Sequence, residues 1–165
     1  MNNNPQMIFV NLPVANLPQS KAFYEAVGFT NNPQFSDDTS ACMVLSESIM
    51  VMLLTHSKWA RFTSKTIPDA RATAQVLLCI SRENREAVDA IVETAARQGG
   101  TADPTPVQDL GFMYGRSFED PDGHIWETVW MNPAAGYVTR RLGRDSQTIR
   151  TMQRIPLFQL AVVSR

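Results

Sequence analysis

One acidic side chain, Glu127, lies in an apolar stretch of the sequence and is the first candidate for chemistry. In residues 124–131 the side chains alternate, so Ile125, Glu127 and Val129 are expected on one face of a strand. A carboxylate among apolar side chains costs free energy unless it is paired, protonated or bound to a ligand. Glu127 is therefore the first candidate for a functional residue.

The residues before this strand predict a tight turn that would fix its position. Asp120, Pro121, Asp122 and Gly123 combine a proline that presets φ, aspartates that accept from nearby amides and a glycine that tolerates positive φ. Residues 112–119 and 124–131 on either side suit strands. We therefore expect a hairpin that holds Glu127 on its second strand.

In the cupped sheet that the family resemblance given below implies, the same alternation predicts which residues share the concave surface with Glu127. They form an apolar trough with few polar groups, which is typical of a small-molecule site. We expect Glu127 to accept a hydrogen bond from the side-chain amide of Asn11 or Gln75. The alternative is a closed core in which these amides only satisfy the carboxylate. The trough residues are Phe9, Asn11, Val51, Leu53, Thr55, Gln75, Leu77, Cys79, Met113, Gly115, Ser117, Ile125, Glu127 and Val129.

Residues 56–72 lack a clear apolar pattern and form a connection that can cover such a site. Trp59 in this connection either stacks on a planar ligand or anchors the connection in the core. The two histidines, His56 and His124, are interpreted as surface or turn residues, with His124 on the opposite face of the hairpin from Glu127.

The elements that position these residues occur in two similar halves, at about 7–55 and 74–131. Each half has a strand, then a helix, then further strands. Asn16 is expected to cap the first helix, and the stripe of Val88, Ile91, Val92 and Ala95 predicts the second helix at about 83–98. Residues 101–108 are broken by prolines and suit an edge strand.

Composition bounds the class of protein. The chain has 165 residues, no apolar run of membrane-spanning length and two cysteines in apolar runs, so we expect a cytoplasmic protein. Residues 136–165 hold six arginines against one aspartate, although the whole chain has a net charge of −1. Residues 1–135 therefore carry a net negative charge and offer no basic surface. Nucleic acid is not expected as a partner. The arginine-rich tail is either an appended segment or a dimer contact, and its role stays open.

Two motifs carry a family resemblance, one in residues 12–29 and one in residues 118–127: LPVANLPQSKAFYEAVGF and FEDPDGHIWE. With the two-half pattern they resemble the vicinal oxygen chelate superfamily over roughly residues 6–132. That superfamily includes glyoxalase I, extradiol dioxygenases, fosfomycin-modifying thiol transferases and bleomycin-binding resistance proteins. The resemblance implies an α+β fold for residues 1–135. In it, two β-α-β-β-β modules form a cupped mixed sheet with helices on the convex face.

The resemblance also implies where a metal would bind. Its ligand positions match Phe9, Leu53, Gln75 and Glu127, and a register shift of one residue replaces Leu53 by Met52. Phenylalanine and leucine offer a cation no lone pair, so we expect neither a metal nor another cofactor unless this alignment is wrong.

Two functions follow as expectations from the resemblance. The first is a metal-free groove that binds an amphipathic or aromatic compound, for example to sequester or detoxify it. The second is a glyoxalase-type lyase or isomerase in which Glu127 moves a proton next to a carbonyl while Asn11, Gln75 or Ser117 steadies the enolate. The resemblance also implies a homodimer.

Overall fold

The computed structural model describes residues 6–135, so the expectation for the arginine-rich tail at 136–165 falls outside the described residues. The first module contains β1 (Ile8–Val14), α1 (Leu17–Ala26), β2 (Thr30–Asp37), β3 (Ser40–Val44) and β4 (Ile49–Thr55). Its strands pair in the order β1-β4-β3-β2, with β1 parallel to β4. As predicted, the Asn16 side chain caps α1 by accepting from the Gln19 amide at 3.1 Å.

A long connection leads to the second module. It starts with the short helix α2 (His56–Trp59), and residues 60–77 form neither helix nor strand. The strand expected at the start of the second half, from about residue 74, therefore begins four residues later, as β5 (Leu78–Ser81). Gln75 consequently lies in the connection and not on a strand.

The second module repeats the order of the first. It contains β5, α3 (Arg85–Arg97), β6 (Thr101–Ala102), β7 (Gln108–Asp109), β8 (Met113–Glu119) and β9 (Ile125–Met131), and η1 (Pro133–Ala135) follows. The strands pair in the order β5-β9-β8-β6, and β7 also pairs with β8. The predicted β8–β9 hairpin is confirmed. The expected edge strand at 101–108 divides into the two short strands β6 and β7.

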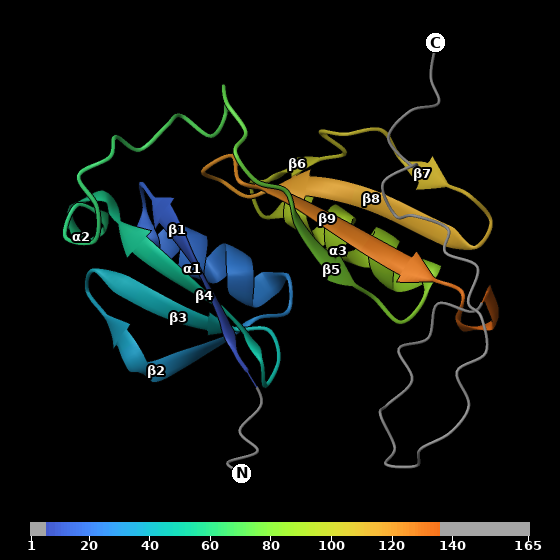
Figure 1. Cartoon of the computed structure of the whole chain (residues 1–165), viewed down its shortest axis with the longest axis horizontal. Coiled ribbons are helices and arrows are strands. Elements are labelled where there is room, and N and C mark those ends of the chain that lie inside the picture. The colour runs from blue at the N-terminus through green and yellow to red at the C-terminus, as the bar shows by residue number, and fades with distance from the viewer. Residues whose placement is uncertain (1–5, 136–165) are drawn as a thin grey trace, which may run out of the picture.

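The α+β class with two β-α-β-β-β modules is confirmed, and its sheet consists of two hydrogen-bonded parts, one in each module. Figure 1 shows α1 and α3 behind the strands, and one apolar core links both helices with both parts of the sheet. In this core Trp126 is 2% exposed and its ring stacks on Phe118. The stripe predicted for α3 is buried, and its Ile91, Val92 and Ala95 belong to the same core. None of the helices in residues 6–135 is long and apolar enough to cross a membrane.

The turn at Asp120–Gly123 ties the second module to the first. Asp122 accepts hydrogen bonds from the Ala15 amide and the Ser20 hydroxyl, both at 2.8 Å. Asp120 accepts from the Tyr24 hydroxyl at 2.8 Å, and that hydroxyl accepts from the Trp126 indole at 3.0 Å. Burial raises the pKa of Asp120 and, together with the nearby Asp120 charge, also the pKa of Tyr24. The turn is therefore both a hairpin connection and the polar joint between the modules.

Candidate functional site

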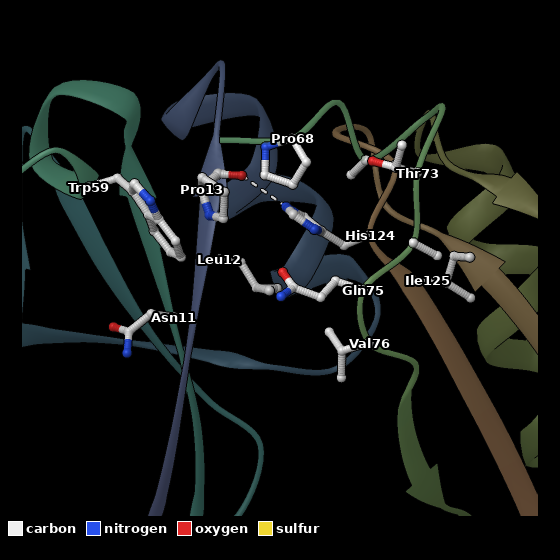
Figure 2. A pocket seen from close by; sticks show the side chains of 13 residues that line it. Asn11, Leu12, Pro13, Trp59, Pro68, Thr73, Gln75, Val76, His124 and Ile125 are labelled. Atoms are coloured by element: carbon white, nitrogen blue, oxygen red, sulfur yellow. Dashed lines mark hydrogen bonds between the residues drawn. The ribbon is translucent and has the colours of Figure 1, made fainter. Parts of the chain in front are cut away.

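A hollow of about 130 Å³ opens where β1 of the first module faces the connection and the start of β9. We call it the inter-module hollow. Figure 2 shows β1 on one side and the segment around Gln75 on the other. It is lined by Asn11, Leu12, Pro13, Trp59, Pro68, Ala70, Thr73, Ala74, Gln75, Val76, Gly123, His124 and Ile125.

Three residues predicted from the sequence meet at this hollow. Asn11 comes from β1, Trp59 from the last residue of α2, and Gln75 from the irregular end of the connection. Trp59 is half-buried, whereas Asn11 and Gln75 are exposed. In Figure 2 the indole of Trp59 points down beside the hollow, and the Gln75 amide lies opposite. The hollow thus offers an aromatic ring and two amides, each of which can both donate and accept hydrogen bonds.

The connection is held over the hollow by its contact with the turn. The Arg71 guanidinium donates to the Pro121 carbonyl. Gly123 has φ of +96°, and a Cβ atom built on it would lie 2.8 Å from the Arg71 backbone nitrogen. Only glycine suits this position, because it combines positive φ with close backbone approach. The wall formed by residues 70–76 is therefore fixed by the same turn that joins the modules.

His124 lines the inter-module hollow, although sequence reasoning interpreted it as a surface or turn residue. Its ring lies at the hollow because β9 begins only at Ile125, so the strand alternation used to place His124 does not extend to it. Its Nε2 lies 2.8 Å from the Pro13 carbonyl oxygen, and its amide donates to Asp120. The available signal was its position directly after the turn glycine, where a well-defined turn fixes the backbone.

Glu127 lies at a different hollow, of about 220 Å³, which we call the hairpin hollow. It faces away from the helices, as predicted, opposite Cys79 on β5 and Ser117 on β8. Burial and the nearby Glu127 charge raise the pKa of the Cys79 thiol. The lining residues are Cys79, Thr105, Pro106, Gln108, Met113, Gly115, Arg116, Glu127, Thr128, Val129 and Met131.

The predicted hydrogen bond from Asn11 or Gln75 to Glu127 is absent. Within residues 6–135 the Glu127 carboxylate accepts no hydrogen bond from either amide, and the two amides line the other hollow. The single trough expected from alternation is thus divided into two hollows. The division arises because Gln75 precedes β5 and does not continue the strand that lies beside Glu127.

Leu53 was predicted to face the groove, and this is wrong. The parallel register of β1 and β4 pairs Asn11 with Met52 and Leu12 with Leu53. Leu53 therefore shares the helix-covered face with Leu12, where it is 0% exposed in the core. Met52 takes the place beside Asn11. Because side chains alternate, an error of one residue in register reverses the face of every residue on the strand.

Of the predicted residues Phe9, Leu77, Met113 and Ser117, only Met113 lines a hollow. Phe9 is 52% exposed and Leu77 is 47% exposed, and neither lines either hollow. Met113 lines the hairpin hollow. Ser117 is buried, and its hydroxyl lies 2.7 Å from that of Thr105 and also accepts from the Thr105 amide. Ser117 is thus occupied in holding the segment between β6 and β7.

The residues at the implied metal positions do not fit a metal centre. Phe9 has no donor atom, Met52 offers only a thioether, and Gln75 and Glu127 line separate hollows. Within the described part of the chain, no group of three or more His, Cys, Asp or Glu residues is arranged to hold a metal ion.

Comparison with known proteins gives a consistent match to one family. The family model described as the Glyoxalase/Bleomycin resistance protein/Dioxygenase superfamily matches residues 6–128. A search of curated proteins gave no significant match.

Solved structures share the fold at low sequence identity. The hypothetical protein SA1046 from S. aureus is 25% identical, with a TM-score of 0.64 over 78% of this chain and 95% of that protein. A glyoxalase/bleomycin resistance protein/dioxygenase family enzyme from Burkholderia phytofirmans PsJN is 20% identical, with a TM-score of 0.63 over 77% and 99%. A glyoxalase-related enzyme from Fulvimarina pelagi is 19% identical, with a TM-score of 0.64 over 76% and 87%.

Proposed function

The chain belongs to the glyoxalase/bleomycin resistance protein/dioxygenase superfamily, and from this membership we propose that it binds an amphipathic or aromatic small molecule in the inter-module hollow. Binding without a metal, as in sequestration or detoxification of a compound, suits the residues at the implied ligand positions. The family supports many functions on one fold, so the proposal depends on the site itself.

The observation that carries the proposal is the meeting of Trp59, Asn11 and Gln75 around one opening. Residues far apart in the sequence supply an aromatic ring and two amides beside apolar Leu12 and Ile125. A ligand site needs this combination, because apolar area supplies affinity and a few polar groups fix orientation.

A library of planar and amphipathic compounds, screened by calorimetry, tests the proposal. Trp59→Ala is expected to weaken the binders about tenfold, equivalent to about 1.4 kcal/mol, because it removes the stacking surface. Phe62→Ala is the matched control, since Phe62 lies in the same connection, is 69% exposed and lines neither hollow. Absence of any binder, or equal losses in both variants, would contradict the proposal.

A second candidate function is proton transfer by Glu127 in the hairpin hollow. The observation in its favour is that the Glu127 carboxylate lines an opening and accepts no hydrogen bond from other described residues. A carboxylate whose lone pairs are free can accept a proton from a bound carbon acid. The amides of Asn11 and Gln75 do not line this hollow, so they cannot be assigned to the enolate.

Exchange of deuterium from solvent into α-hydroxy-carbonyl compounds tests this second candidate. We expect faster exchange with the wild type than with Glu127→Gln, which keeps the size of the side chain but removes the base. Glu119→Gln on the preceding strand is the control, because Glu119 does not line the hollow. If wild type and Glu127→Gln give equal rates, Glu127 is not the base.

A further inference from the structure

The hydrogen bond between His124 and Pro13 fixes which nitrogen of the imidazole carries a proton. Nε2 lies 2.8 Å from the Pro13 carbonyl oxygen. A carbonyl oxygen can only accept, so Nε2 must be the donor. In the neutral imidazole the other nitrogen, Nδ1, then has a lone pair and is an acceptor.

The Nδ1 lone pair has no partner within residues 6–135. No other described residue makes a hydrogen bond with Nδ1, and the atom is not among the buried, unpaired ones. Nδ1 is therefore not sealed from solvent, and it belongs to a residue that lines the inter-module hollow. Figure 2 shows the ring between Pro13 and Gln75, with the dashed line marking the bond at Nε2.

The ring cannot easily turn away from the hollow, because its backbone is held on both sides. The His124 amide donates to the Asp120 carboxylate at 2.8 Å, and the His124 carbonyl accepts from the Asp120 amide at 3.0 Å. With Nε2 held by Pro13 as well, Nδ1 is presented to a ligand without a large loss of side-chain freedom. Such preorganisation favours affinity and selectivity.

The other lining residues restrict the charge of the ligand. The inter-module hollow is lined by no Asp, Glu, Lys or Arg side chain among the described residues. These lining side chains offer an ion no partner charge, so they would not compensate the free energy that the ion loses with its water. An uncharged ligand meets no such cost. The Trp59 ring further favours a planar one.

We propose that His124 is a specificity-determining residue of this hollow, whose Nδ1 accepts a hydrogen bond from an uncharged planar ligand bearing an N–H or O–H group on its edge. This ligand class includes heteroaromatic N–H compounds and phenols. The inference rests on the proposed binding function and adds to it the polarity of the ligand. A site that offers an acceptor rejects an analogue without a donor, because its polar group is then left unpaired.

Indole and benzofuran test the inference, because they have nearly the same shape and differ in the presence of the N–H donor. The wild type is expected to bind indole about five- to tenfold more tightly than benzofuran in calorimetry. His124→Phe is expected to reduce this ratio to about one, since phenylalanine keeps a ring but has no acceptor. His56→Phe is the matched control and should keep the ratio of the wild type.

Nitrogen NMR of the wild type provides a readout that does not depend on the fold of a variant. The chain has two histidines, so His56→Phe assigns the signals of His124. We expect an unprotonated Nδ1 that shifts when indole binds and stays unchanged with benzofuran. A purely structural role of His124 would move neither the ligand ratio nor this signal.

Equal affinities for indole and benzofuran in the wild type would overturn the inference. So would a lack of binding of both probes, or an Nδ1 that carries the proton. If library compounds still lose affinity in Trp59→Ala in these cases, the proposed binding function stands without the role of His124. If the library gives no binder at all, the proposed function itself is wrong.

Discussion

At the scale of single residues, Gly123 gives the sharpest prediction of stability. Its φ is +96°, and an added Cβ atom would lie only 2.8 Å from the Arg71 backbone nitrogen, which leaves no room for a side chain. Gly123→Ala is expected to lower the free energy of unfolding by about 2–3 kcal/mol, through backbone strain and displacement of the connection. Urea unfolding followed by circular dichroism measures this change.

Gly28→Ala separates the two causes. Gly28 has a similar φ of +100°, but no atom lies within 4 Å of its added Cβ. We expect a loss of about 1 kcal/mol there, because only the positive φ is unfavourable. If the free energy of unfolding falls equally in the two variants, close contact between the connection and the turn does not contribute to the loss.

Sequence reasoning placed Glu127 on the correct face but failed for Leu53, and the reason is local. Glu127 follows a turn whose glycine and proline fix where alternation starts. The sequence therefore shows which residues of β9 share a face. β4 has the run Ile49–Thr55 with apolar residues at almost every position, so nothing in the sequence distinguishes its two faces. The register with β1 decides between Met52 and Leu53, and a pairing between strands that lie 41 positions apart is not a local signal.

At the scale of elements, the short strand β7 is held against the start of α3 by an ion pair. Arg85 binds both carboxylate oxygens of Asp109 at 2.7 Å, and its guanidinium lies over the Tyr114 ring at 4.8 Å from the centroid. The hydrogen bonds from Arg85 lower the pKa of Asp109 from 3.8 to about 2, with help from the Gly111 amide. The pair therefore connects an edge of the sheet with a helix.

Arg85→Gln is expected to move the pKa of Asp109 back toward 3.8, because the main hydrogen bonds to the carboxylate are lost. The pKa is depressed in the folded state, so the stability from this pair is present above pH 3.8. It is lost as pH falls through about 2. An NMR titration of the carboxyl carbons measures the pKa. Arg97→Gln, whose partners lie on α3 itself, should leave Asp109 unchanged.

The order of elements was predictable because helix caps and apolar stripes are local. Asn16 caps α1, Asn84 caps α3, and the buried stripe of α3 has helical spacing. The limits of β5 were not predictable in this way. Residues 74–77 are apolar enough for a strand, yet the connection runs past the turn and contacts it at Arg71 before pairing begins at Leu78. This tertiary contact moved Gln75 away from Glu127 and divided the expected trough.

At the scale of the whole molecule, we predict a homodimer. Within residues 6–135, β1 pairs only with β4 and β5 only with β9, so each leaves one edge without a strand partner. Phe9 and Leu77, next to these edges, are about half exposed. A second copy of the chain, related by symmetry, would cover these exposed apolar side chains. Light scattering at micromolar concentration should give about twice the 18.4 kDa of one chain.

Phe9→Asp is expected to shift this equilibrium to the monomer, because it places a charge in the contact. Phe35→Asp is the control, since Phe35 is 65% exposed on β2, at the opposite edge of the same part of the sheet. A mass near 18.4 kDa for the wild type would contradict the dimer. Dissociation by both substitutions alike would place the contact elsewhere.

The joint between the modules also has a consequence for hydrogen exchange. The Ala15 amide lies in an exposed stretch of backbone, yet it donates to Asp122, which is 107 positions away in the sequence. Its partner is held by a turn of the other module, so this hydrogen bond is expected to break when the two modules separate. We therefore expect the Ala15 N–H to exchange more slowly than other amides at exposed positions, and Asp122→Ala, which removes the acceptor, to abolish this protection.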